Sequence, residues 1–130
     1  MPAGDIEVPP PGNATYITEG VMFNQMAREW RCKWSDGTGN MTLPLCQKAL
    51  MEVAAPVLQY VPGAQVQRIV SEERRDFKVI VKCTVNDFDL WKQTGFSPEL
   101  EFLEALQSIP GVSEVESQTY TIAPVCSVGR

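Results

Sequence analysis

Residues 77–85 read FKVIVKCTV, and this stretch decides the fold. Two sets of side chains alternate along it: Phe77, Val79, Val81 and Cys83 in one set, and Lys78, Ile80, Lys82 and Thr84 in the other. A period of two with many β-branched residues predicts a β-strand whose first set faces a core. The charged run at 71–75 predicts a hairpin turn, so a further strand at about 65–70 is expected beside this one.

A second alternating stretch lies upstream, around the first two tryptophans. Trp30, Cys32 and Trp34 fall on one face of it, and Arg31 and Lys33 fall on the other. This pattern predicts another half-buried strand, with its tryptophan and cysteine side chains in the core.

Two similar stop signals divide the rest of the chain. Val61-Pro62-Gly63-Ala64 and Ile109-Pro110-Gly111-Val112 each follow an apolar stripe at helical spacing and precede a strand-like segment. We therefore predict an α+β domain with the ferredoxin-like βαββαβ order, in two βαβ-like halves. Right-handed crossovers then put both helices on one face of a four-stranded antiparallel sheet. With the strands numbered along the chain, the expected spatial order is 4-1-3-2.

Local signals mark the ends of the first helix. Thr42 or Leu43 is expected to cap it, with Pro44 in its first turn, where a missing N–H is tolerated. Pro56 lies inside the helical pattern, so we expect a kink or an early end near Ala55.

The second helix carries similar signals. Ser97 is expected to cap it, with Pro98 at its first position. Its predicted buried stripe consists of Leu100, Leu103, Leu106 and Ile109, with Phe102 beside it.

The chain divides into a Pro-rich N-terminal arm at 1–26, the ferredoxin-like domain at 27–125 and a C-terminal tail at 126–130. Three consecutive prolines in the arm favour an extended chain. Apolar side chains follow them, among them Tyr16, Ile17 and Phe23. Two interpretations stay open: the arm lies on its own domain, or it wraps around a partner through these three side chains.

Composition excludes several classes of function. The 130 residues carry a formal net charge of −5 and contain no histidine. An acidic chain is a poor match for the backbone of nucleic acid, so we expect no nucleic-acid partner. No apolar stretch is long enough to span a bilayer, so we expect no membrane span. We also expect no catalytic residue, no cofactor and no metal, because the commonest general base and metal ligand is missing.

The four cysteines indicate a reducing environment. Cys32, Cys46, Cys83 and Cys126 are too widely spaced for a zinc motif, and a domain of this size needs no disulfide. We expect buried free thiols, with Cys126 the most exposed. An intracellular, reducing location follows, in the cytoplasm or in an organelle after removal of a transit peptide. The N-terminus has no basic or apolar region typical of a secretory signal.

The sheet face opposite the helices is the candidate binding surface. We expect it to carry Arg31, Lys33, Lys78, Ile80, Lys82 and Tyr120. The last residue depends on register, because alternation alone permits either Glu116, Gln118 and Tyr120 or Val115, Ser117 and Thr119 on this face. Three interpretations stay open: a solvated face, an interface with a second copy or another acidic partner, or a pocket for a small anion. RNA binding is disfavoured, since the aromatic platforms it needs are predicted to point inward.

From Tyr60 onward the order of features resembles the effector-binding domain of the leucine-responsive regulator (Lrp/AsnC) family. The shared features are the first stop signal, a strand at 66–70, Asp76-Phe77 entering a strand, and the second stop signal leading to Glu116 and Thr119. The family's helix-turn-helix is absent, and Glu-Glu-Arg-Arg stands where a glycine is usual. The resemblance implies a binding module that dimerises through its sheets, and it specifies no ligand.

Two hypotheses of function follow. The first is a non-catalytic binding or assembly module, either a homodimer or an accessory subunit of a larger complex, that uses the open sheet face and the arm. The alternative is a small dimeric α+β barrel enzyme acting on an anionic or aromatic small molecule held by Arg31, Lys78 and Tyr120. Regulation by a small effector is a variant of the first hypothesis.

Overall fold

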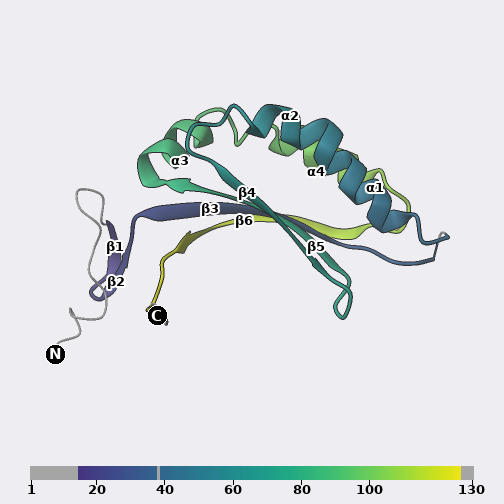
Figure 1. The fold of residues 1–130 in the computed structure, drawn as a ribbon, viewed down its shortest axis with the longest axis horizontal. Helices are drawn as coiled ribbons and strands as arrows, with labels where there is room; N and C mark the ends of the chain where they lie inside the picture. Colours follow the sequence, from purple (N-terminus) through teal and green to yellow (C-terminus); the bar gives the residue numbers. More distant parts are fainter. Residues whose placement is uncertain (1–14, 38, 127–130) are drawn as a thin grey trace.

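The computed structural model describes residues 15–37 and 39–126. Its main sheet is antiparallel, with four strands in the order β4 (Gln65–Ser71), β5 (Asp76–Thr84), β3 (Gln25–Lys33) and β6 (Ser113–Ile122). The helical segments are α1 (Thr42–Ala49), η2 (Leu50–Ala54), α2 (Ala55–Leu58), α3 (Val85–Lys92) and α4 (Glu99–Gln107). Figure 1 shows them together on one side of the sheet. The ferredoxin-like fold and the predicted strand order are confirmed.

The core lies between the helices and the two central strands. Trp30 on β3 and Phe77 and Val81 on β5 are fully buried, as the alternation predicts. The Trp30 ring packs against Trp91 of α3 and Phe102 of α4, with centroids 6.0 and 5.5 Å apart. This aromatic cluster joins α3 and α4 to the sheet. Burial of each large apolar side chain adds about 2 kcal/mol to the stability of the fold.

The first helix runs through Pro56 instead of ending before it. Residues 50–54 form a π-helical turn, and Pro56 then lies in the first turn of α2. A π-turn changes the hydrogen-bond register, and the first turn of a helix needs no N–H donor at that position. The disturbance expected near Ala55 is therefore present as a wider turn just upstream.

The start of α1 differs from the expected cap. Met41 occupies the N-cap position, and the Thr42 hydroxyl donates to the carbonyl of Pro110 at 2.9 Å. Gly111, with φ +93°, approaches the same hydroxyl so closely that a Cβ atom there would collide with it. Thr42 thus joins the first helix to the second stop signal, a long-range role that its local sequence does not reveal.

The start of α4 also differs, because Pro98 is the N-cap residue and the helix begins at Glu99. The carboxylate of Glu99 accepts from Arg28 Nε and Trp30 Nε1 on β3, both at 2.7 Å. This contact turns the face of Glu99, Phe102 and Leu106 toward the sheet. Leu100 lies off that face and is 66% exposed, so its place in the predicted stripe is wrong.

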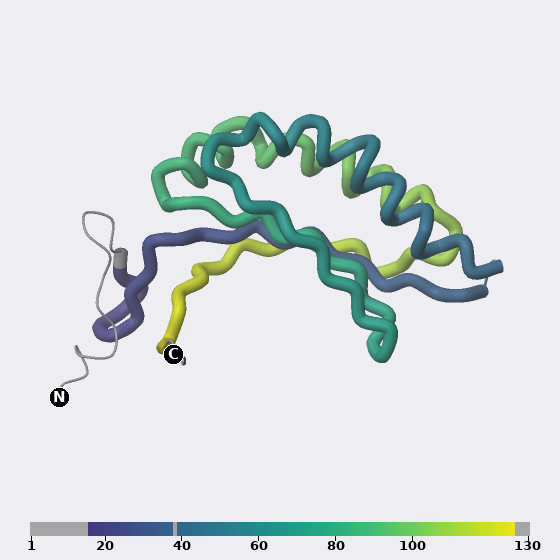
Figure 2. The backbone as a smooth tube through the Cα atoms, viewed as in Figure 1, coloured from purple at the N-terminus to yellow at the C-terminus, as the bar shows by residue number. Residues whose placement is uncertain are grey.

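The arm contains a small hairpin of its own, β1 (Thr15–Thr18) and β2 (Val21–Phe23). In Figure 2 it lies beyond the helix layer, next to the start of β3, which begins at Gln25. Tyr16 and Ile17 are exposed, and Phe23 is buried. The prolines of the arm lie outside the described residues.

The cysteines match the sequence expectation. All four are free thiols, with Cys32, Cys46 and Cys83 buried and Cys126 exposed. Burial raises the pKa of Cys83 to about 11, and Asp87 adds to the effect.

No helix within the described part of the chain is long and apolar enough to cross a membrane.

Candidate functional site

The face of the sheet opposite the helices is the candidate site, and strand register defines its members. Cross-strand rows pair Ala27 with Lys82 and Tyr120, Glu29 with Ile80 and Gln118, and Arg31 with Lys78 and Glu116. Lys33 and Asp76 form the next row. We call this set, with Gln67 and Ile69 of β4, the open face. In Figure 1 it is the lower, concave side of the sheet.

All six residues predicted for this surface lie on the open face: Arg31, Lys33, Lys78, Ile80, Lys82 and Tyr120. The register of β6 is settled in favour of Glu116, Gln118 and Tyr120. What the structure adds is a set of carboxylates among the cations, at Glu29, Asp76 and Glu116. The face is therefore mixed in charge rather than uniformly basic.

Asp76 neutralises part of the predicted cation cluster. Lys33 Nζ lies 2.6 Å from its Oδ1 atom, and the guanidinium of Arg31 lies 3.6 Å from the same oxygen. The bond from Lys33 lowers the pKa of Asp76, and the charges of Arg31 and Lys78 lower it further against the effect of burial. The Asp76 side chain is only 9% exposed, and the neighbouring cations keep its carboxylate ionised despite this burial.

Glu29 is a second carboxylate that sequence reasoning missed. It lies in the middle of the open face and is 4% exposed. Its carboxylate accepts from Gln118 Nε2 at 2.9 Å and from the Tyr120 hydroxyl at 3.3 Å. Burial raises the pKa of Tyr120, and the charge of Glu29 raises it further. The signal was available, since Glu29 precedes Arg31 by two positions and shares its face.

The two remaining lysines are placed differently from Arg31 and Lys33. Within residues 15–37 and 39–126, neither Lys78 nor Lys82 forms an ion pair. They flank Ile80, which is half-buried and lies opposite Glu29. Glu116 lies on β6, on the other side of β3. Its side chain is 61% exposed and lies 3.8 Å from the guanidinium of Arg31. The open face thus has free cations on β5 and an exposed carboxylate on β6.

The predicted arm residues differ in their exposure. Tyr16 and Ile17 expose apolar surface on β1, whereas Phe23 is buried where the arm joins the domain. Among the residues that the structure describes, no group of three or more His, Cys, Asp or Glu side chains is arranged to hold a metal ion.

Comparison with known proteins shows the fold. No model of a known protein family matches the chain, and no curated protein matches it. A monooxygenase from the gene ActVA-Orf6 of Streptomyces coelicolor, in complex with nanaomycin D, is similar in structure with a TM-score of 0.54 at 15% identity, covering 82% of this chain and 94% of that one. A de novo designed protein with a ferredoxin fold gives a TM-score of 0.46 at 16% identity, over 82% and 92%. The strand order of the chain itself defines an α+β protein of the ferredoxin-like fold, and at these identities the similarity extends no further than the fold.

Proposed function

We propose that this protein is a non-catalytic binding and assembly module whose open face packs against the open face of a second copy. The observation that carries the proposal is the separation of charge across β3. Lys78 on β5 forms no ion pair within the described residues, and Glu116 on β6 is exposed in the same cross-strand row. A uniformly basic face would repel its own copy, whereas this one is complementary to itself.

The strand order allows the complementary charges of two copies to meet, because β5 and β6 lie on either side of β3. A two-fold axis running along β3 would place β5 of one copy over β6 of the other. Residues of one row stay in that row under this operation, so Lys78 would meet Glu116 of the second copy. Ile80 would lie inside the contact, where its half-buried side chain adds apolar area.

The small size of the open face favours a contribution from the arm to the proposed interface. Four strands about 4.8 Å apart and seven residues long span roughly 20 by 23 Å, or about 450 Å² in projection. A stable interface buries about 800 Å² on each partner. The exposed Tyr16 and Ile17 of the β1–β2 hairpin are suited to supply part of the difference.

A pair of matched variants tests self-association through this face. Ile80→Glu puts a second carboxylate opposite Glu29 in the middle of the open face, so we expect a monomer by light scattering at concentrations where the unaltered chain is a dimer. Leu100→Glu makes the same change at an exposed leucine on the helix layer, and we expect it to remain a dimer. A monomeric unaltered chain at 100 µM, or equal behaviour of the two variants, would contradict the proposal.

The resemblance to the Lrp/AsnC effector-binding domain supports the same mode of assembly, because it implies dimerisation through sheets. The accessory-subunit form of the proposal keeps the same surface with a different chain in place of the second copy. Co-purification of a stoichiometric partner that is lost in Ile80→Glu and kept in Leu100→Glu would favour that form.

A small dimeric α+β barrel enzyme is the second candidate, and one observation favours it. Glu29 and Tyr120 form a carboxylate–hydroxyl pair on a face that a second copy would enclose, next to Arg31. Such a pair is suited to proton transfer, with Arg31 and Lys78 available for an anionic substrate. Thermal stabilisation of the full chain by aromatic acids such as benzoate and salicylate tests it. Stabilisation that disappears in Tyr120→Phe supports the enzyme, and no stabilisation by either compound counts against it.

A further inference from the structure

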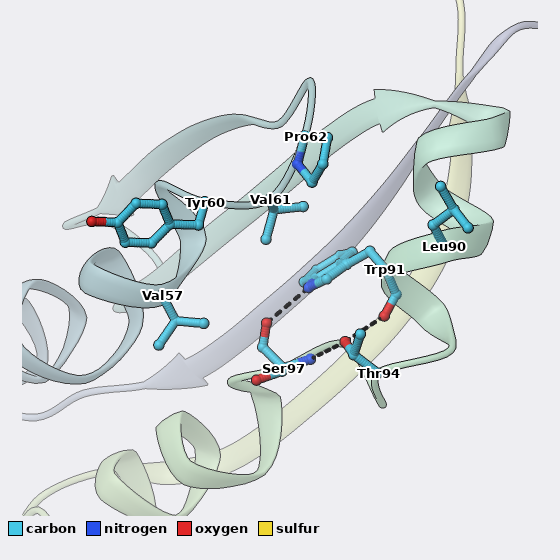
Figure 3. A pocket seen from close by; sticks show the side chains of 8 residues that line it. All are labelled: Val57, Tyr60, Val61, Pro62, Leu90, Trp91, Thr94 and Ser97. Carbon is cyan, nitrogen blue, oxygen red and sulfur yellow. Dashed lines mark hydrogen bonds between the residues drawn. The ribbon is translucent and has the colours of Figure 1, made fainter.

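A cavity lies in the helix layer, away from the residues of the open face. Its volume is about 430 Å³, which falls within the range of small-molecule sites. Figure 3 shows Val57, Tyr60, Val61 and Pro62 on one wall and Leu90 and Trp91 on the facing wall. The walls come from α2 with its following turn and from α3, and Thr94 and Ser97 complete the lining.

Hydrogen bonds and ring packing hold the side of the cavity formed by α3 and the segment after it. Trp91 Nε1 donates to the Ser97 carbonyl at 2.8 Å, and the Thr94 hydroxyl donates to the Trp91 carbonyl at 2.6 Å. The Trp91 ring packs edge-on against Phe96 and Trp30, with centroids 5.0 and 6.0 Å apart. The indole is therefore fixed in place before any ligand arrives, which lowers the entropic cost of binding.

The rest of the lining is apolar and unusually exposed. Tyr60 is 79% exposed, Leu90 58% and Val57 39%. A contiguous apolar group of this kind on a surface is typical of a binding site. All eight lining residues are uncharged, so a charged ligand would lose its hydration there without gaining an ionic partner.

We propose that this cavity binds a neutral, flat and mainly apolar small molecule, with Trp91 as its floor. The site is separate from the open face and does not depend on self-association. Apolar burial supplies the affinity, and the lack of charge in the lining supplies the selectivity.

The probe for the test is 2-naphthol, with 2-naphthoate as its charged counterpart. The three tryptophan indole N–H groups give three separate reporters in a ¹⁵N–¹H spectrum of the full chain. Trp91 lines the cavity, whereas Trp34 donates to the Asp76 carbonyl elsewhere. We expect 2-naphthol to shift the Trp91 signal in a saturable way and leave Trp34 unchanged, and to bind at least tenfold more tightly than 2-naphthoate.

Leu90→Glu and Leu100→Glu are matched variants, because both replace an exposed helix leucine and only Leu90 lines the cavity. We expect Leu90→Glu to weaken 2-naphthol at least tenfold and Leu100→Glu to change it less than twofold. An unmoved Trp91 signal, equal affinity for the two probes, or equal effects of the two variants would overturn the proposal.

Other occupants of the cavity would show themselves in the same titration. Binding seen only after replacement of Pro9, Pro10 and Pro11 by alanine would assign the cavity to the chain's own N-terminal segment. Binding seen only on dilution of the protein would assign it to a second copy. Either result would also overturn the small-molecule proposal.

Discussion

The Tyr120 hydroxyl donates to Glu29 Oε1 at 3.3 Å across neighbouring strands, in the middle of the open face. Burial raises the pKa of Tyr120, and the charge of Glu29 raises it further. The two groups are therefore coupled electrostatically. The middle of the open face therefore holds a hydrogen-bonded pair with a buried carboxylate, and not only solvated charges.

Glu29→Gln tests this coupling. The amide keeps a hydrogen-bond acceptor and removes the charge, so we expect the pKa of Tyr120 to fall part of the way to that of an ordinary tyrosine, with the burial effect remaining. Ring signals of Tyr120 followed by NMR against pH measure the change, with the exposed Tyr60 as the internal control. An unchanged Tyr120 titration in the variant would show that the charge of Glu29 does not reach the ring.

Asp76 makes stability depend on acid pH. Its pKa in the folded chain is lowered, chiefly by Lys33, so the unfolded chain takes up the proton first. The stabilisation is complete above the ordinary aspartate value of about 3.9 and is lost as pH falls from there through the lower folded value. Urea unfolding between pH 2 and 6 measures this slope, and Asp76→Asn is expected to flatten it. A slope that is equally steep in Asp76→Asn would place the acid sensitivity elsewhere.

Gly111 is expected to be the glycine least tolerant of alanine. Gly111→Ala strains a left-handed backbone position and forces a methyl group against the buried Thr42 side chain. Gly39→Ala is a matched control, because Gly39 has φ +69° with open space around it. Strain at the left-handed position lowers the free energy of unfolding by about 1 kcal/mol in both variants. The collision lowers it by about 2 kcal/mol more in Gly111→Ala alone. Urea midpoints measure both, and similar losses in the two variants would contradict the close contact with Thr42.

Thiol reactivity is expected to separate one cysteine from the other three. Cys126 is exposed, whereas Cys32, Cys46 and Cys83 are buried, and a hydrogen bond to Cys46 together with burial raises the pKa of Cys32. A disulfide reagent at pH 8 should therefore react quickly with one thiol per folded chain and with four after unfolding. Cys126→Ser should remove the fast reaction. A fast reaction that persists in Cys126→Ser would mean that a buried thiol opens to solvent.

Sequence reasoning reached the fold because its signals are local. The alternation around Trp30 and Val79 lies within single strands, and each Pro-Gly stop signal lies within one short turn. Strand order then follows from handedness rules. The start of α4 was misplaced because Glu99 is set by a contact with Arg28 and Trp30, about 70 positions away. No pattern within one segment encodes such a contact.

The sequence predicted only part of the open face, because alternation is local and strand register is not. Alternation placed Arg31 and Lys78 on it, but the carboxylates that balance them depend on which residues of β6 and β5 come opposite. Register supplied Glu116, and the position of Asp76 at the start of β5 supplied the partner of Lys33. The Trp91 cavity had no sequence signal, because its walls come from separate helices.

A charge swap measured by sedimentation equilibrium tests self-association through the open face most directly. Lys78 and Glu116 lie in one cross-strand row, and the proposed two-fold contact brings each against the other in the second copy. We predict that Lys78→Glu and Glu116→Lys each weaken the dimer at least tenfold, and that the double variant recovers most of the affinity. A chain that sediments with the mass of one copy at 100 µM, or a double variant no better than the single ones, would contradict the account.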